Sequence, residues 1–321
     1  MSRISSKTDT VALPDGAKLA YDIFGAEHLP TTSPIVLVGG ASPRSGVSGF
    51  VITFRSIGLR PQVGMGDSRL ANRDEKHTIE LLARDLLSLI QHLGWKQLSL
   101  CGFSMGGVVV QQLILLPYHP TKPTSLPFTA THVILAGSLC EPLRDKRFGL
   151  PPPPPAGKIL SEQEKMDIAR EMLSLSYDPA WLADPGNASR IQEMLGLMVA
   201  GRIQEMLGLM VAGRPRGVIL KQMRAMNRFD FTDQHTRLPR SMQFLVIHGT
   251  LDRIVPPSCG EEIVRRIPWA RSLEIDPAGN TRGTVPNVAF GHSWYEYFDV
   301  QVWVDVIEEF VGGGMPLVAR L

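Results

Sequence analysis

The segment Gly102-Phe103-Ser104-Met105-Gly106-Gly107 places one serine hydroxyl among three glycines. A short apolar run ending at Cys101 precedes it and a longer helix-favouring run, 108–116, follows, so Ser104 is predicted to lie at a strand-to-helix turn. A turn this sharp strains its apex residue and leaves no room for β-carbons beside it, which explains the glycines. We therefore predict a nucleophile elbow, with the serine oxygen raised above a sheet and the Met105 amide directed at the same space to hold an oxyanion.

A serine hydroxyl needs a base to take its proton and a third group to orient that base. Two downstream segments supply candidates. Asp252 lies in a loop directly after the apolar run 244–247, and His292 lies in a loop before a helical pattern. Ligand chemistry in open parallel sheets gathers at the carboxyl ends of the strands. We therefore expect Asp252 and His292 to approach Ser104 there.

The remaining pattern predicts the elements that position these three residues. Apolar periodicity and turn residues indicate a hairpin at 11–24 around Pro14-Asp15-Gly16, buried strands at 35–38, 98–101, 132–136 and 244–247, and helices at 78–93, 108–116 and 294–311. Strands that alternate with helices imply a mostly parallel sheet covered on both faces. The predicted class is therefore α/β.

The chain changes character between Gly137 and Arg240. Five consecutive prolines, 151–155, are followed by helical patterns, and no buried strand is evident. We expect a helical cap at 138–240, inserted into a core made of 1–137 and 241–321, that covers the Ser104 side of the sheet.

The predicted cap contains an unchanged duplication, because Arg190–Gly201 recurs as Arg202–Gly213. Two copies of twelve residues are too few and too short for a repeat fold. At 3.6 residues per turn, the second copy's apolar face is rotated by about 120° from the first. Either a helix breaks at Gly201 or part of one copy is looped out; nothing in the repeat suggests chemistry.

Composition excludes several classes of function. A net charge of +2 with 44% hydrophobic residues gives no electrostatic reason to expect nucleic acid as a partner. The start of the sequence has no apolar leader, and no later run reaches the ~18 apolar residues of a membrane span, so we expect a soluble, cytoplasmic protein. The C-terminal Ala319-Arg320-Leu321 resembles a peroxisomal signal, but three residues match by chance often enough that a cytosolic location is preferred.

The three cysteines lie far apart in the sequence. The positions of Cys101, Cys140 and Cys259 match no metal-ligand spacing and suggest no disulfide framework. We expect them to be small buried hydrophobic residues, and we expect neither a metal nor an organic cofactor.

Three motifs, GFSMGG at 102–107, GTLDRIVPP at 249–257 and GHSWYEY at 291–297, together resemble the α/β-hydrolase fold family, in its capped esterase and lipase-like form. The resemblance covers most of 35–311 outside the cap, and over 64–145 it is similar to fungal members. It implies hydrolysis of a carboxylic ester or related small-molecule acyl substrate through an acyl-enzyme, without a cofactor.

The same resemblance implies the roles of the site residues. Ser104 is then the nucleophile, His292 the general base and Asp252 the orienting acid, in the family's chain order. The oxyanion hole would use the backbone amides of Met105 and Ala41. Glu141, after the strand at 132–136, is the alternative acid, because some members of the fold take the carboxylate from that position.

The segment between Ala41 and Val63 departs from the family pattern. Members normally have a strand here that ends in an aspartate and an arginine before a GxGxS turn. Gly64-Met65-Gly66-Asp67-Ser68 keeps the turn, but Val63 replaces the arginine and the aspartate is missing. We expect 50–54 to act as a substitute strand. This departure and the duplication support an alternative: a catalytically impaired binding protein, or the product of a faulty gene model.

Overall fold

The computed structural model describes residues 7–29, 31–40, 58–59, 77–152, 154, 158–198, 218–231 and 233–312. Within these residues one sheet of eight strands runs in the order β1-β2-β4-β3-β5-β6-β7-β8. The strands are β1 (Lys7–Ala12), β2 (Lys18–Ile23), β3 (Ile35–Val38), β4 (Gly58–Leu59), β5 (Gln97–Phe103), β6 (Thr129–Ala136), β7 (Gln243–Ile247) and β8 (Arg271–Ser272). The pairings from β4 through β8 are parallel, and the antiparallel pairings are those of β1 with β2 and of β2 with β4. The predicted α/β class with a mostly parallel sheet is confirmed.

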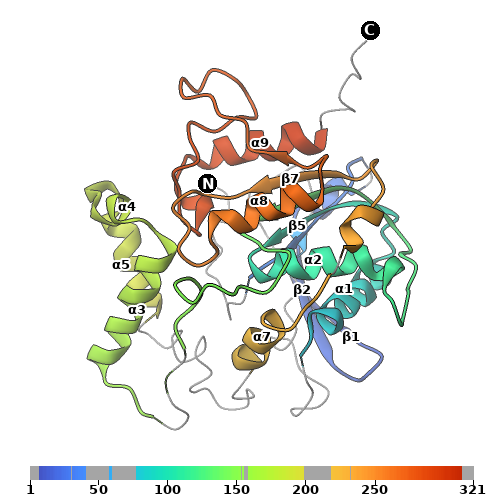
Figure 1. Ribbon diagram of the computed structural model, residues 1–321, viewed down its shortest axis with the longest axis horizontal. Coiled ribbons are helices and arrows are strands. Elements are labelled where there is room, and N and C mark those ends of the chain that lie inside the picture. Colours follow the sequence, from blue (N-terminus) through green and yellow to red (C-terminus); the bar gives the residue numbers. More distant parts are fainter. Residues whose placement is uncertain are drawn as a thin grey trace.

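The central strands are buried on both faces, as their unbroken apolar runs require. Along β3, Val36 and Val38 belong to the apolar core shared with α1 (Ile79–Leu93), α2 (Met105–Leu115) and α8 (Pro257–Arg266). The alternate residues Ile35 and Leu37 face the opposite core, which contains α9 (Val300–Gly312). Figure 1 shows α9 on one side of the sheet and α1 and α2 on the other.

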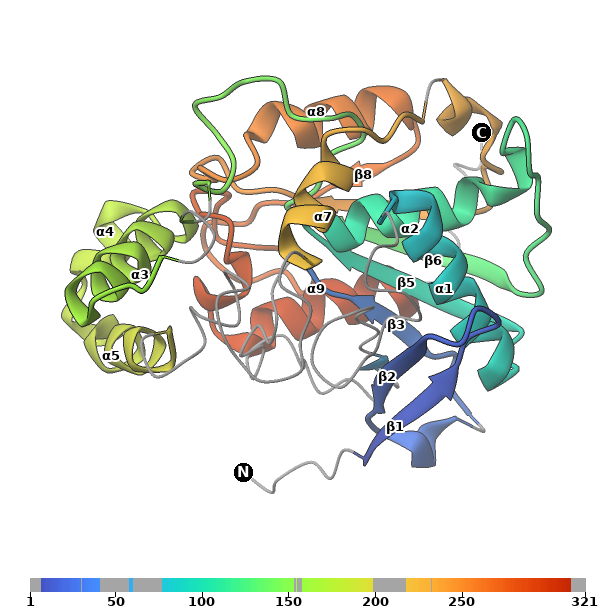
Figure 2. The ribbon, with the colours of Figure 1, turned by 90° about the horizontal axis from the view of Figure 1, so that it is seen from below.

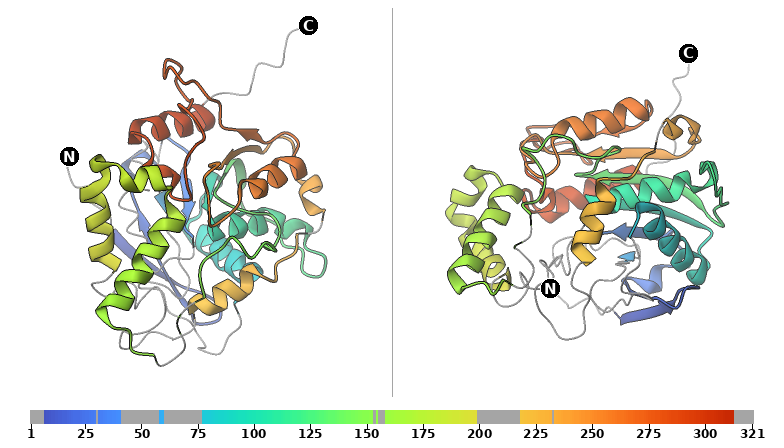
Figure 3. Two further views of the ribbon diagram at one scale, coloured as in Figure 1. Left: turned by 60° about the vertical axis from the view of Figure 1, so that its left-hand side comes forward. Right: turned by 60° about the horizontal axis from the view of Figure 1, so that its bottom comes forward.

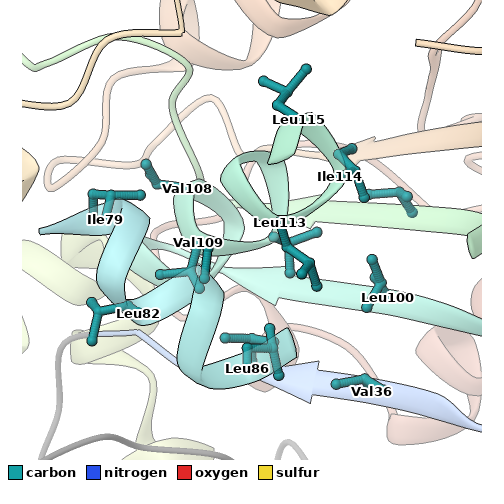
Figure 4. Close-up of a cluster of buried hydrophobic side chains, with 14 of the residues drawn as sticks. Val36, Ile79, Leu82, Leu86, Leu100, Val108, Val109, Leu113, Ile114 and Leu115 are labelled. Atoms are coloured by element: carbon teal, nitrogen blue, oxygen red, sulfur yellow. The ribbon is translucent and has the colours of Figure 1, made fainter. Parts of the chain in front are cut away.

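The α1 helix shows how local signals fix an element. Thr78 caps its start by accepting a hydrogen bond from the Leu81 amide at 3.0 Å, and Gly94 ends it with φ of 70°. Its buried side chains, with Leu82 and Leu86 among them, pack beside α2 and over Val36 and Leu100 of the sheet (Figure 4). The helix predicted at 78–93 is therefore confirmed almost to the residue.

The sequence prediction of one continuous helix at 294–311 is wrong at its start. The chain forms a 3-10 turn, η6 (Trp294–Glu296), and α9 begins only at Val300. Asp299 starts this helix, because its carboxylate accepts a hydrogen bond from the Gln301 amide at 2.8 Å. Tyr297, in the break, uses its hydroxyl to accept a hydrogen bond from the Asp178 amide at 2.9 Å. A contact with a residue 119 positions away thus favours the break.

The segment between β6 and β7 contains α3 (Glu162–Ser176), α4 (Pro179–Ala183), α5 (Ala188–Leu197) and α7 (Val218–Met226). The described residues of 138–240 include no strand. The helices α3, α4 and α5 share a small apolar cluster of their own and lie beyond the end of the sheet to which the β5 arrow points (Figures 2 and 3). We call α3, α4 and α5 the inserted helices.

Several predicted features lie outside the described residues. They are the substitute strand at 50–54, the turn at 64–68, the second copy of the duplication at 202–213 and the C-terminal tripeptide 319–321. The first copy lies mostly in α5. In the part of the chain that the structure describes, no helix combines the length and apolarity needed to cross a membrane.

A buried polar network around Gln111 joins α2 to neighbouring segments. The Gln111 side-chain amide donates to the Gly107 and Leu139 carbonyls, each at 3.0 Å, and its oxygen lies 3.0 Å from His235 Nε2, which must therefore donate. Burial, with a smaller contribution from the Arg266 charge, lowers the pKa of His235 to about 4. His235 is consequently neutral in the folded protein near neutral pH.

We expect the free energy of unfolding to decrease as the pH is lowered from 6.5 toward 4, because of His235. The unfolded histidine binds a proton near pH 6.5, whereas the folded one does so only near pH 4. His235 therefore stabilises the fold above pH 6.5, and about 3 kcal/mol of this contribution is lost as pH falls toward 4. His235→Gln keeps a neutral donor, and its free energy of unfolding in urea should depend less on pH over this range. Equal pH slopes for the two proteins would contradict the assignment.

Candidate active site

Ser104 lies at the turn between β5 and α2 with φ of 55° and ψ of −123°. It is the single non-glycine residue with positive φ in the described part of the chain. Its amide donates to the Ala136 carbonyl at 2.8 Å, and its carbonyl accepts from the Ser138 hydroxyl at 2.9 Å. Its hydroxyl does not cap the helix. Neighbouring strands thus hold a strained backbone that leaves the hydroxyl available.

The glycines around Ser104 allow backbones to meet at distances that side chains forbid. A β-carbon on Gly106 would lie 2.0 Å from the Val38 carbonyl oxygen, and one on Gly102 would lie 2.4 Å from the Gly107 Cα. Both distances fall far inside van der Waals contact with backbone atoms, which cannot move aside. The turn can therefore form only with glycine at these two positions.

The structure brings Asp252 and His292 together. Asp252 follows β7, and its Oδ1 accepts hydrogen bonds from the Ile254 and Val255 amides at 2.9 and 2.8 Å. Its Oδ2 lies 2.7 Å from His292 Nδ1. The side chains are 1% and 8% exposed, so the contact is shielded from water. With Nδ1 donating to the carboxylate, Nε2 is the ring nitrogen left to accept a proton.

The His292 ring lies against the residues that carry Ser104. A β-carbon on Gly137 would lie 3.2 Å from both Nδ1 and Cε1 of this ring, and Gly137 directly follows Ala136, to which Ser104 is bonded. The ring of Phe103, the residue before Ser104, has its centroid 4.9 Å from that of His292. The imidazole thus packs against the last residue of β5 and lies beside the residue that follows β6.

Backbone contacts join the loop that carries Asp252 to the loop that carries His292. The Leu251 amide donates to the Phe290 carbonyl at 3.1 Å, and the Thr250 amide donates to the Val288 carbonyl at 2.8 Å. A β-carbon on Gly249 would lie 1.9 Å from the Phe290 carbonyl oxygen. Because these backbone contacts hold the two loops together, they set the spacing between Asp252 and His292.

His248, which the sequence places at a strand end as a structural residue, lies beside Asp252, and this neighbour was not predicted. Its Nε2 lies 2.9 Å from the Val255 carbonyl and 3.6 Å from Asp252 Oδ2. The bond to a carbonyl requires a protonated Nε2, which fixes the tautomer. Burial lowers the pKa of His248, although the nearby Asp252 charge opposes this shift. A neutral His248 supports the Asp252 loop without competing as a cation for the carboxylate. The sequence feature that could have indicated this role is the position of His248 directly after β7.

Only part of the predicted oxyanion site lies within the described residues. Met105 begins α2, so its amide belongs to the first turn, where backbone N–H groups lack partners within the helix. A β-carbon on Gly40 would lie 3.1 Å from Ser104 Cβ, which places the end of the β3 loop beside the hydroxyl. Ala41, the other predicted donor, follows Gly40 and lies outside the described residues.

The alternative acid Glu141 is engaged elsewhere. Its carboxylate lies 2.7 Å from Arg266 Nη2, and its side chain is about half exposed. The structure therefore pairs Asp252, and not Glu141, with His292. Within the described residues, no three His, Cys, Asp or Glu side chains are grouped to hold a metal ion.

A family model described as the alpha/beta hydrolase family matches residues 29–296. The chain belongs to the alpha/beta hydrolase family. It is a hydrolase with the family's fold, in which Ser104 occupies the turn after β5.

Individual relatives agree with this membership. The pimeloyl-[acyl-carrier protein] methyl ester esterase of Aeromonas hydrophila subsp. hydrophila is 26% identical over 262 residues, which cover 78% of this chain and 82% of the relative. A hydrolase from Pseudomonas aeruginosa PA01 superposes with a TM-score of 0.62 at 21% identity, covering 95% of this chain and 98% of that one. A thermophilic esterase from Thermogutta terrifontis gives 0.61 at 19% identity, covering 96% and 98%. These two structural likenesses show the alpha/beta hydrolase fold.

The close approach at Gly106 predicts a large effect of one methyl group. Gly106→Ala should lower the free energy of unfolding by about 3 kcal/mol, because the added carbon must separate α2 from β3. Gly196→Ala is the matched control, since nothing lies within 4 Å of its added carbon, and alanine in a helix should raise stability by up to about 1 kcal/mol. Urea denaturation measures both values; equal stabilities would contradict the packing argument.

Proposed function

We propose that the protein hydrolyses a carboxylic ester of a small molecule through an acyl-enzyme formed on Ser104. His292 is the general base and Asp252 orients it. The observation that carries this proposal is the buried 2.7 Å contact between His292 Nδ1 and Asp252 Oδ2, with the ring packed against Phe103, the residue before Ser104. A serine, an imidazole and a carboxylate in this arrangement activate a hydroxyl that is otherwise a poor nucleophile.

In the acylation step, Ser104 Oγ attacks the ester carbonyl carbon while His292 Nε2 takes the hydroxyl proton. The imidazolium that forms is stabilised by Asp252, whose burial keeps the interaction strong. The carbonyl oxygen becomes an oxyanion and is held by the Met105 amide and, by the family resemblance, the Ala41 amide. The bond to the alcohol oxygen then breaks, and His292 returns the proton to the departing alcohol.

In the deacylation step, water replaces the alcohol. His292 takes a proton from this water, the hydroxide attacks the acyl carbon, and a second oxyanion forms in the same place. Collapse of this intermediate breaks the bond to Ser104 Oγ, which receives the proton from His292. The products are a carboxylic acid and the regenerated enzyme. The same residues thus serve both halves of the reaction.

The relatives support an ester as the substrate class. The curated relative is a methyl ester esterase and one of the similar structures is an esterase, so ester cleavage is the activity we carry over to this chain. We also propose that 138–240 forms a cap on a core of 1–137 and 241–321. The position of the inserted helices beyond the carboxyl end of the sheet supports this division (Figure 2).

Replacement of the nucleophile tests the proposal directly. Ser104→Ala should lower turnover of p-nitrophenyl esters of graded chain length by about 10⁴-fold or more, and it should abolish covalent labelling by a fluorophosphonate probe. Ser174→Ala, which changes a partly buried serine of α3 whose hydroxyl donates to the Glu171 carbonyl, should label like the wild type. Equally slow labelling of folded wild type and Ser104→Ala would exclude the serine mechanism.

The acid is tested by exchanging its charge for an amide. Asp252→Asn should lower kcat by about 10⁴-fold, because the amide favours the wrong imidazole tautomer while leaving the geometry intact. Glu141→Gln is the comparison, since it makes the same chemical change at the alternative acid, and its kcat should remain within about twofold. Steady-state kinetics on one ester measures both. If the loss occurs in Glu141→Gln instead, the acid has been assigned to the wrong residue.

A further inference from the structure

The loop that carries His292 is held from a second side by the inserted helices. Arg190 of α5 donates two hydrogen bonds to Glu296 of η6, from Nη2 to Oε1 at 2.6 Å and from Nε to Oε2 at 3.3 Å. The two side chains are 26% and 16% exposed. Arg190 Nη1 also lies 2.7 Å from Glu193 one turn along α5, which orients the guanidinium. A two-pronged contact of this kind fixes direction as well as distance.

Neighbouring contacts join the same two parts of the chain. The Trp181 indole donates to the Glu296 carbonyl at 3.3 Å, and the Ser293 amide donates to the Ser176 carbonyl at 3.2 Å. The rings of Tyr177, Trp181 and Tyr297 pack together, with the Tyr177 centroid 4.1 Å from that of Trp181 and 6.2 Å from that of Tyr297. The charged pair is therefore part of a packed junction between the inserted helices and the loop.

This junction lies close to the proposed base. Ser293 is the next residue after His292, and Glu296 is four residues after it. A β-carbon on Gly291, the residue before His292, would lie 2.6 Å from the Ser176 carbonyl oxygen. The residues on either side of His292 thus contact the end of α3, while the Asp252 loop holds the ring itself. Displacement of the inserted helices would move the segment that orients the imidazole.

We propose that Arg190 is a positioning residue which, through Glu296, fixes the loop that carries His292 and so couples the inserted helices to the general base. This inference rests on the proposed role of His292. Arg190 acts through Glu296 and touches no reacting atom. Its loss should therefore lower the rate of the chemical step more than it changes substrate binding, because small errors in placing a catalytic group reduce rate steeply.

The duplication provides a matched control. Arg190 and Arg202 each open an identical twelve-residue copy, so both have the same following sequence. The structure assigns the contact with Glu296 to Arg190. Arg190→Ala and Arg202→Ala therefore make the same change in the same local sequence, and only the first removes this contact.

The test measures kcat, KM and the rate of fluorophosphonate labelling. The variants are Arg190→Ala, Arg202→Ala, Arg190→Lys, Glu296→Ala and the double variant Arg190→Ala/Glu296→Ala. Arg190→Ala should lose about tenfold in kcat and labelling rate, with KM within about threefold, and Arg190→Lys should recover part of the loss. Arg202→Ala should remain within about twofold. The double variant should be no slower than the worse single variant, since both changes remove one interaction.

Circular dichroism at the assay temperature should show each variant folded, so that activity is compared between folded proteins. Equal activity of Arg190→Ala and Arg202→Ala, or losses that multiply in the double variant, would overturn the positioning role. Wild-type protein that neither labels nor turns over an ester would instead contradict the proposed function. An active wild type with an unaffected Arg190→Ala contradicts only the coupling.

Discussion

The hydrogen bond between His292 Nδ1 and Asp252 Oδ2 is the interaction on which the arrangement of the site depends. A carboxylate as buried as Asp252 is costly unless its oxygens are bonded. Two backbone amides satisfy Oδ1, and the imidazole satisfies Oδ2. The bond to Oδ2 also fixes the tautomer and direction of His292. The imidazole that stabilises the buried carboxylate is therefore the same group that the proposed chemistry needs as a base. The loops after β7 and before η6 must be close for this bond to form, and the contact between Gly249 and Phe290 provides that closeness.

Strain at Ser104 is maintained by contacts from two neighbouring strands, β3 and β6, and from the residues that follow β6. The Ala136 carbonyl and Ser138 hydroxyl hold its backbone from β6 and the residues after it, while β3 approaches Gly106 closely. A left-handed φ on a serine persists only where surrounding structure over-determines it. The glycines do not make the turn flexible; they let backbones pack so closely that the strained conformation is the one that fits.

Local signals predicted much of this fold from the sequence. β3 was predicted at 35–38 because its apolar run is unbroken, and α1 because Thr78 and Gly94 mark its ends. The candidate acid followed from its place after a buried strand, and the candidate base from its loop before a helical pattern. Other features depend on distant partners: β4 is only Gly58–Leu59 and is defined by pairing with β2 and β3, and the break before α9 involves Asp178. The pair Arg190 and Glu296 spans 106 positions, and no local pattern marks either residue as a partner of the other.

The duplication shows that local sequence alone does not determine every contact of a segment. Two identical segments have identical helix propensity and identical side chains, so neither property can decide which copy contacts Glu296. The first copy differs in what precedes it. Asp184 accepts from the Gly186 amide at 2.8 Å, and Asn187 donates to the Trp181 carbonyl at 3.0 Å, which sets the start of α5 beside the aromatic cluster. The second copy is preceded by Gly201 instead.

A partly buried ion pair such as Arg190 and Glu296 adds little net stability after desolvation. In the proposed coupling, its effect is to fix the Glu296 segment, and with it the loop that carries His292, relative to α5.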